Sequence, residues 1–162
     1  MIRRKLKGTV KHPKIEAFLE KYKIPMEYFR FNRRMLAKGV AIGLFFAFIP
    51  MPLQILTVIL LAPLFKYNIP AAVAMCLLTN PLTMPIVYYI EYLTGSFLLG
   101  IEPQSVEMSV EWFSQNISKI FIPLYFGALF YSTLLAVSSY YLINWLWRKS
   151  VKRAKERTLH KV

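Results

Sequence analysis

Residues 39–100 read GVAIGLFFAFIPMPLQILTVILLAPLFKYNIPAAVAMCLLTNPLTMPIVYYIEYLTGSFLLG, and this apolar stretch determines the architecture. Prolines interrupt it at two places, marked by Pro50, Pro52, Pro81 and Pro85. Proline lacks a backbone donor and therefore ends or kinks a helix. Each half, 39–65 and 69–100, is predicted to form a short apolar helix, a proline-bearing break and a second short helix. Two interrupted segments in corresponding positions are typical of a transporter binding site.

Charged and apolar residues occupy different segments of this chain. The 162 residues include 21 Lys+Arg and 8 Asp+Glu, for a formal net charge of +13, although 56% of the residues are hydrophobic. Segment 1–38 sums to +9, 39–147 to −2 and 148–162 to +6. A nucleic-acid binder needs cations over the surface of a packed fold, and the middle segment has almost none. The pattern excludes a nucleic-acid partner and predicts an integral membrane protein with basic flanks.

The positions of the charges also predict a topology. Lys and Arg concentrate on the cytoplasmic side of membrane proteins, so both termini are expected in the cytoplasm and the number of crossings is even. Residues 101–119 contain Glu102, Glu107 and Glu111, and this polar stretch is predicted to be an external loop. The linker residue Lys66 favours a re-entrant hairpin for 39–65 and a crossing for 69–100. Three short crossings are the alternative.

We therefore expect an all-α membrane protein, multi-pass in the inner membrane. It would be a small helical bundle with two Pro-interrupted segments, re-entrant or broken, at 39–65 and 69–100. Residues 120–147 form the longest apolar run after the loop and predict one long C-terminal transmembrane helix, because a span needs about 20 apolar residues. Residues 148–162 are predicted to be a basic cytoplasmic tail.

Residues 1–38 are predicted to hold basic amphipathic helices in the cytoplasm or at the membrane interface. One helix is expected after Pro13 and a second after Pro25, running toward the membrane. The second would bring cations to anionic lipid headgroups, and the candidate headgroup contacts are Arg30, Arg33, Arg34 and Lys38. A solvated helix that merely follows the charge rule is the alternative interpretation.

The residue inventory offers little for catalysis. There is no Asp, the two His residues are His12 and His160 near the termini, and Cys76 is single and lies inside an apolar run. Catalytic triads with Asp, carboxylate clusters for magnesium and zinc sites all need residues that this chain lacks or scatters. We expect no enzyme activity, no metal and no cofactor. Cys76 is predicted to be a small buried apolar residue.

Three ordered motifs resemble a known family, namely 48–54 (FIPMPLQ), 66–68 (KYN) and 80–85 (NPLTMP). The segment 95–100 (GSFLLG) follows them. In these motifs the chain resembles the bacterial integral membrane family catalogued as domain of unknown function 2062. The resemblance implies an inner-membrane location and no established biochemical activity. Similar domains occur attached to sugar transferases, which implies a link to envelope or lipid-linked precursor biology.

Four polar residues flank the breaks and form the candidate substrate-binding set, namely Gln54, Thr79, Asn80 and Thr83. Unpartnered amides are costly inside a bilayer. If the two break tips meet, they present Gln54 and Asn80 together, beside helix N-termini that attract anions. The alternative is that these side chains only cap broken helices and hold the tips together.

Glu91 completes the candidate set, because an ionisable residue inside a span is by default a functional candidate. It lies midway along the apolar run 86–99, so a proton-coupling role is one hypothesis. A position at the membrane interface or a structural pair with Lys66 are alternatives.

These features predict a small transporter or handler of an anionic or lipid-linked envelope substrate, working as an oligomer. The alternative is a non-catalytic scaffold that docks an envelope-synthesis enzyme through its basic ends.

Overall fold

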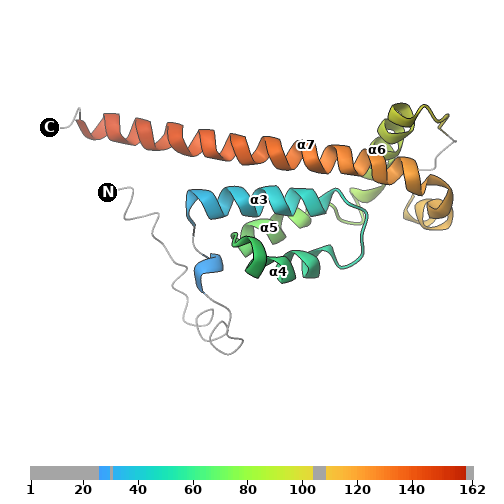
Figure 1. Ribbon diagram of the computed structural model, residues 1–162, viewed down its shortest axis with the longest axis horizontal. Helices are drawn as coiled ribbons and strands as arrows, with labels where there is room; N and C mark the ends of the chain where they lie inside the picture. Colours follow the sequence, from blue (N-terminus) through green and yellow to red (C-terminus); the bar gives the residue numbers. More distant parts are fainter. Residues whose placement is uncertain (1–25, 30, 104–108, 160–162) are drawn as a thin grey trace.

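The computed structural model describes residues 26–29, 31–103 and 109–159, and this part of the chain is all-helical (Figure 1). The helix expected after Pro13 and the side chain of Arg30 lie outside the described residues. The elements in chain order are η1 (Met26–Phe29), α3 (Arg33–Ala47), α4 (Gln54–Phe65), α5 (Ile69–Cys76), α6 (Met84–Leu99) and α7 (Val110–Leu159). Within the described residues there is no strand, which confirms the all-α class.

Helices α3 and α4 form an antiparallel hairpin, and α5 then turns back beside them (Figure 1). The end of α4 lies next to the start of α3, because Lys38 Nζ donates to Phe65 O at 3.3 Å. The following linker is anchored there too, since Asn68 N donates to Met35 O at 3.1 Å. The hairpin therefore returns the chain to the end of the molecule from which α3 began.

Helix starts at this end are closed by asparagine side chains. Asn32 Oδ1 accepts a hydrogen bond from Met35 N at 2.9 Å, and Asn68 Oδ1 accepts one from Ala71 N at 2.8 Å. Asn32 therefore begins α3 afresh after η1, as expected for an N-cap residue. The helix expected after Pro25 is thus divided, since η1 ends at Phe29 and α3 begins at Arg33.

Prolines lie in or beside both breaks. Pro50 and Pro52 fall between α3 and α4, and Pro81 falls between α5 and α6. Pro85 is in the first turn of α6, where its missing N–H has no intrahelical partner to lose.

The 50-residue helix α7 runs antiparallel to α3, so the start of α3 and the end of α7 lie at the same end of the molecule (Figure 1). It begins at Val110, inside the segment 101–119 expected as a loop, and extends to Leu159 through most of the expected tail. The reason is composition, because no Gly or Pro occurs between Val110 and Pro123, and the tail is rich in the strong helix formers Lys and Arg. Its stretch Ser118–Arg153, 36 residues, is long and apolar enough to cross a membrane.

Glycines let the helices approach one another closely in two places. A Cβ atom on Gly43 of α3 would lie 2.4 Å from Ala72 O of α5. A Cβ atom on Gly95 of α6 would lie 1.7 Å from Pro123 O of α7, and one on Gly127 would lie 1.9 Å from Glu91 O. Backbone contact across small residues is typical of helix pairs in membranes.

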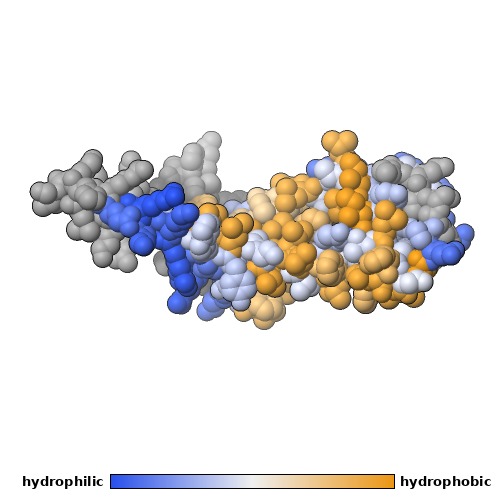
Figure 2. Space-filling view, turned by 90° about the horizontal axis from the view of Figure 1, so that it is seen from above, coloured by the Kyte–Doolittle hydropathy of each residue, from blue (hydrophilic) through white to orange (hydrophobic). Residues whose placement is uncertain are grey.

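The exterior is strongly apolar between two hydrophilic ends (Figure 2). Many large hydrophobic side chains are exposed along α4, α6 and α7, among them Leu64, Phe97 and Leu142. A monomeric protein in water rarely exposes so large a contiguous apolar surface.

Candidate functional site

The two breaks meet through Gln54 and Thr79. Gln54, the first residue of α4, donates through Nε2 to Cys76 O at 3.1 Å and to Thr79 Oγ1 at 3.2 Å. Thr79 Oγ1 in turn donates to Ala47 O at 2.8 Å. These bonds tie together the end of α3, the start of α4 and the end of α5. We call Gln54, Thr79 and the carbonyl groups of Ala47 and Cys76 the tip cluster.

Asn80 and Thr83 belong to a separate turn. Asn80 Oδ1 accepts from Leu82 N at 2.9 Å and from Thr83 N at 3.2 Å. Thr83 Oγ1 donates to Leu78 O at 2.7 Å. Gln54 thus bonds to Thr79, whereas the sequence predicts that it meets Asn80. Asn80 is exposed, and the bonds of its side chain stabilise its own turn.

Two exposed leucines border the tip cluster. Leu53, which precedes α4, is 72% exposed and has a left-handed backbone with a φ of 59°. A non-glycine residue in this region carries backbone strain of about 1 kcal/mol or more, and it persists only where its surroundings hold it. Leu82, in the second break, is 85% exposed. Both breaks therefore present irregular backbone and apolar side chains on the surface.

The starts of α4 and α6 differ from those of α3 and α5. Asparagine side chains cap α3 and α5, whereas the residues before α4 and α6, Leu53 and Thr83, make no side-chain capping bond in the described structure. The first N–H groups of a helix have no intrahelical acceptor. Neither start has a side-chain cap, but the two differ. At α6, Met84 N donates to Asn80 O at 2.8 Å and Pro85 has no N–H, so the start of α4 is the one that leaves several N–H groups without an acceptor in the described structure.

Glu91 lies away from the tip cluster, where α6 crosses α7. Its side chain is 1% exposed, and neither carboxyl oxygen has a hydrogen-bond partner among the described residues. Lys66, considered above as an ion-pair partner, is exposed at the far end of α4. Glu91 is thus enclosed and unpaired in this arrangement.

A tyrosine that sequence reasoning missed links the two regions. The Tyr125 hydroxyl of α7 donates to Pro50 O in the first break. Tyr125 also lies near Tyr88 of α6, and Tyr88 in turn lies near Glu91. Nothing in the sequence marks Tyr125, because it is one aromatic residue among many in a long apolar helix.

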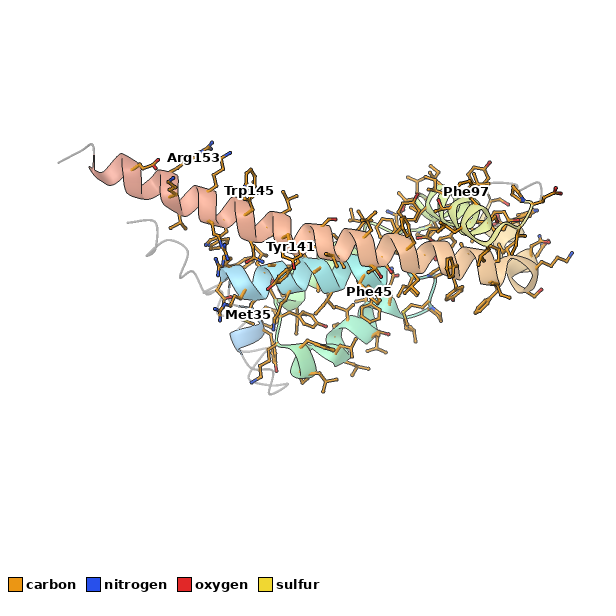
Figure 3. All side chains as sticks on the ribbon, turned by 45° about the horizontal axis from the view of Figure 1, so that its top comes forward. Met35, Phe45, Phe97, Tyr141, Trp145 and Arg153 are labelled. Atoms are coloured by element: carbon orange, nitrogen blue, oxygen red, sulfur yellow. The ribbon has the colours of Figure 1, made fainter. Side chains whose placement is uncertain are left out.

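Basic side chains gather at the end where α3 begins and α7 finishes. Met35 of α3 and Arg153 of α7 both lie at this end (Figure 3). Arg33 is half-buried, while Arg34 and Lys38 are exposed. Exposed cations of α7 at this end include Arg148, Lys149, Lys152 and Arg153. We call the seven basic residues Arg33, Arg34, Lys38, Arg148, Lys149, Lys152 and Arg153 the cationic end.

The remaining sequence candidate, Cys76, is buried and its thiol lies 3.6 Å from Gly43 O. This confirms the prediction of a small buried residue. Among the described residues no group of three or more His, Cys, Asp or Glu side chains could hold a metal ion.

Fold and site define a small all-helical protein with one helix able to cross a membrane and two breaks joined by a polar cluster. Residues 16–156 match the model of a family described as an uncharacterized protein conserved in bacteria, domain of unknown function 2062. The chain belongs to this family. Neither a curated protein nor a solved structure matches it significantly.

Proposed function

We propose that the protein is a multi-pass protein of the bacterial inner membrane with both termini in the cytoplasm. The apolar exterior between two hydrophilic ends supports a lipid surrounding (Figure 2). The cationic end supports the orientation, because Lys and Arg favour the cytoplasmic side. The cationic end combines residues from the start of α3 and the end of α7, so these two helix ends would face the same side of the membrane.

In this arrangement α3 and α4 form a re-entrant hairpin. The 15 residues of α3 rise about 22 Å, less than the roughly 30 Å of a hydrocarbon core. With Arg34 and Lys38 at the headgroups, the tip cluster lies inside the bilayer. Helices α5 and α6 then make the interrupted crossing, and α7 returns to the cytoplasmic side.

The function that this geometry supports best is transport or handling of an anionic or lipid-linked envelope substrate at the tip cluster. The observation that carries the proposal is the start of α4 in the first break, which has no side-chain cap. Irregular backbone inside a bilayer must face protein or a watered cavity rather than lipid. Free N–H groups at helix starts bind phosphate and other anions.

The test is native mass spectrometry of the full chain in mild detergent with phosphatidylglycerol as the probe. Leu53→Asp places a negative charge at the start of α4, and Leu53→Asn is the matched control, since both side chains can cap a helix and tolerate the left-handed backbone. We expect the Asp variant to retain about fivefold less phosphatidylglycerol than the Asn variant, which corresponds to about 1 kcal/mol of helix-dipole interaction.

Equal retention by the two Leu53 variants would contradict the proposal. Arg34→Gln tests the competing position, because it weakens retention of a lipid that sits at the cationic end. If this variant alone loses the lipid, the site is at the headgroups and not at the tip cluster.

A second candidate function is a membrane scaffold for an envelope-synthesis enzyme. The observation that favours it is the continuation of α7 to Leu159 as a helix whose cations are exposed. Reversing the charge of Arg148, Lys149 and Lys152 should then remove a co-purifying partner chain while phosphatidylglycerol retention stays unchanged. Loss of lipid with the partner unchanged would favour the first function.

A further inference from the structure

The crossing of α6 and α7 encloses an ionisable group without giving it a partner. Glu91 O faces Gly127, and Pro123 O faces Gly95, so the two backbones are in direct contact on both sides of one turn. The pairing of 91 with 127 and of 95 with 123 shows that the helices are antiparallel here. The Glu91 side chain is buried beside this contact with both oxygens unbonded.

Within the described part of the chain, no Lys or Arg side chain bonds to the Glu91 carboxyl. Tyr88 of α6 lies near Glu91, and Tyr125 of α7 lies near Tyr88. Tyr89 and Tyr92 of α6 belong to the hydrophobic cluster between the two helices. Both carboxyl oxygens of Glu91 are buried, and neither has a hydrogen-bond partner among the described residues. Another buried oxygen of α6, Ser96 Oγ, also has no hydrogen-bond partner among the described residues.

An ionised carboxylate in such surroundings is far more costly than a neutral acid. Burial of an unpaired charge is normally avoided by neutralising the group. In the packed arrangement Glu91 therefore carries its proton. Ionisation requires water at the carboxylate, and the direct backbone contact at Gly95 and Gly127 means that α6 and α7 must first separate.

We propose that Glu91 is a proton-binding site whose occupancy holds α6 against α7. When the carboxyl O–H bond breaks, the proton passes to water that enters between the helices, and the carboxylate remains solvated there. Movement of α7 reaches the first break through the Tyr125 hydroxyl and Pro50 O. The inference rests on the proposed function, because it makes proton release the event that rearranges the tip cluster.

Infrared difference spectroscopy of the full chain in lipid vesicles tests proton binding. All eight acidic side chains are Glu, so glutamate labelled with ¹³C at the side-chain carboxyl identifies every acidic band. At neutral pH we expect the carbonyl band of a protonated acid that disappears in Glu91→Gln and persists in Glu111→Gln, an exposed control at the start of α7. Raising the pH with a sodium-free base should remove this carbonyl band, because the carboxyl group then loses its proton.

Three results would overturn the assignment. They are the absence of a protonated-acid band from the labelled wild type, persistence of the band in Glu91→Gln, and removal of the band by sodium at constant pH but not by alkali. The last result would assign the site to a metal cation. Should Glu91→Gln fail to fold, the pH titration of the labelled wild type still decides whether a buried acid is present.

Hydrogen exchange of the α6 amides tests the separation of the helices. After correction for the intrinsic pH dependence, we expect alkali to speed exchange in the wild type by about tenfold, as a local opening does, and to leave Glu91→Gln unchanged. Equal acceleration in both proteins would overturn the coupling. Lipid retention by the Leu53 variants is measured separately, so loss of the proposed function is distinguishable from loss of the proton site.

Discussion

The hairpin region, α3 to α5, and the α6–α7 pair use the same packing device but treat their polar groups differently. In both, glycines bring backbones into contact, at Gly43 in the first region and at Gly95 in the second. In the hairpin region the buried polar side chains are bonded, as Thr79 is to Ala47 O. In the α6–α7 pair, Glu91 and Ser96 present buried oxygens with no partner among the described residues.

The difference separates structural polar groups from candidates for function. A bonded buried group stabilises a fold, whereas an unbonded one lowers its stability. Selection retains such a destabilising group where activity needs it. The tip cluster thus has the hydrogen bonding of a structural joint, and its link to function lies in the helix starts that it positions. Glu91, by contrast, is buried with unbonded oxygens, as expected for a functional residue.

Gly95→Ala is expected to have the largest effect on the comparison. The new Cβ would lie 1.7 Å from Pro123 O, so α6 and α7 must move apart, and we expect the free energy of unfolding to fall by about 3 kcal/mol. Chemical denaturation in detergent measures it. Gly43→Ala, with its Cβ at 2.4 Å from Ala72 O, should cost about 2 kcal/mol because its clash is milder.

Gly100→Ala is the control for these glycine changes. Its Cβ would meet open space, but the backbone φ is 66°, so only conformational strain of about 1 kcal/mol is expected. A cost at Gly100 equal to that at Gly95 would show that close packing is not what the glycines provide.

Glu91→Met is expected to stabilise the protein, in contrast to the glycine substitutions. It replaces two unbonded oxygens by an apolar side chain of similar length, so the free energy of unfolding should rise by about 1.5 kcal/mol at neutral pH. Glu91→Gln keeps a polar group in place and should change it much less. Thermal unfolding in detergent provides the measurement, and a Met variant less stable than wild type would show that the carboxyl has a stabilising partner.

Much of this architecture follows from local sequence. The apolar runs and the prolines predict where helices lie, because these signals act within a few residues. The full extent of α7 was missed because a basic tail resembles a solvated segment, although its residues favour helix.

The candidate site was less predictable because its contacts are long-range. Two adjacent polar residues, Thr79 and Asn80, are possible partners of Gln54. Which of them faces Gln54 depends on how α5 ends, and the local sequence does not reveal this. The bond between Tyr125 and Pro50 joins residues 75 positions apart. The position of Glu91 in an apolar run suggested burial, but its lack of a partner depends on α7, which no local pattern reveals.

Thr79→Val should have the smallest of these effects, and it tests whether the tip cluster is a structural joint. Valine has the shape of threonine without the hydroxyl, so the change removes the bond to Ala47 O and one acceptor of Gln54. We expect a loss of about 1 kcal/mol in the free energy of unfolding. Asn80→Ala, in the exposed neighbouring turn, should cost about 0.5 kcal/mol.

Lipid retention in the same two variants sharpens the contrast further. If Thr79 acts only by joining the helix ends, its loss loosens the start of α4, and phosphatidylglycerol retention falls in proportion to stability. If Thr79 contacts the lipid directly, retention falls while stability changes little. Asn80→Ala provides the baseline, because the Asn80 side chain bonds only within its own turn in the described structure. A larger loss of retention in Asn80→Ala than in Thr79→Val would move the binding surface from the tip cluster to the second break.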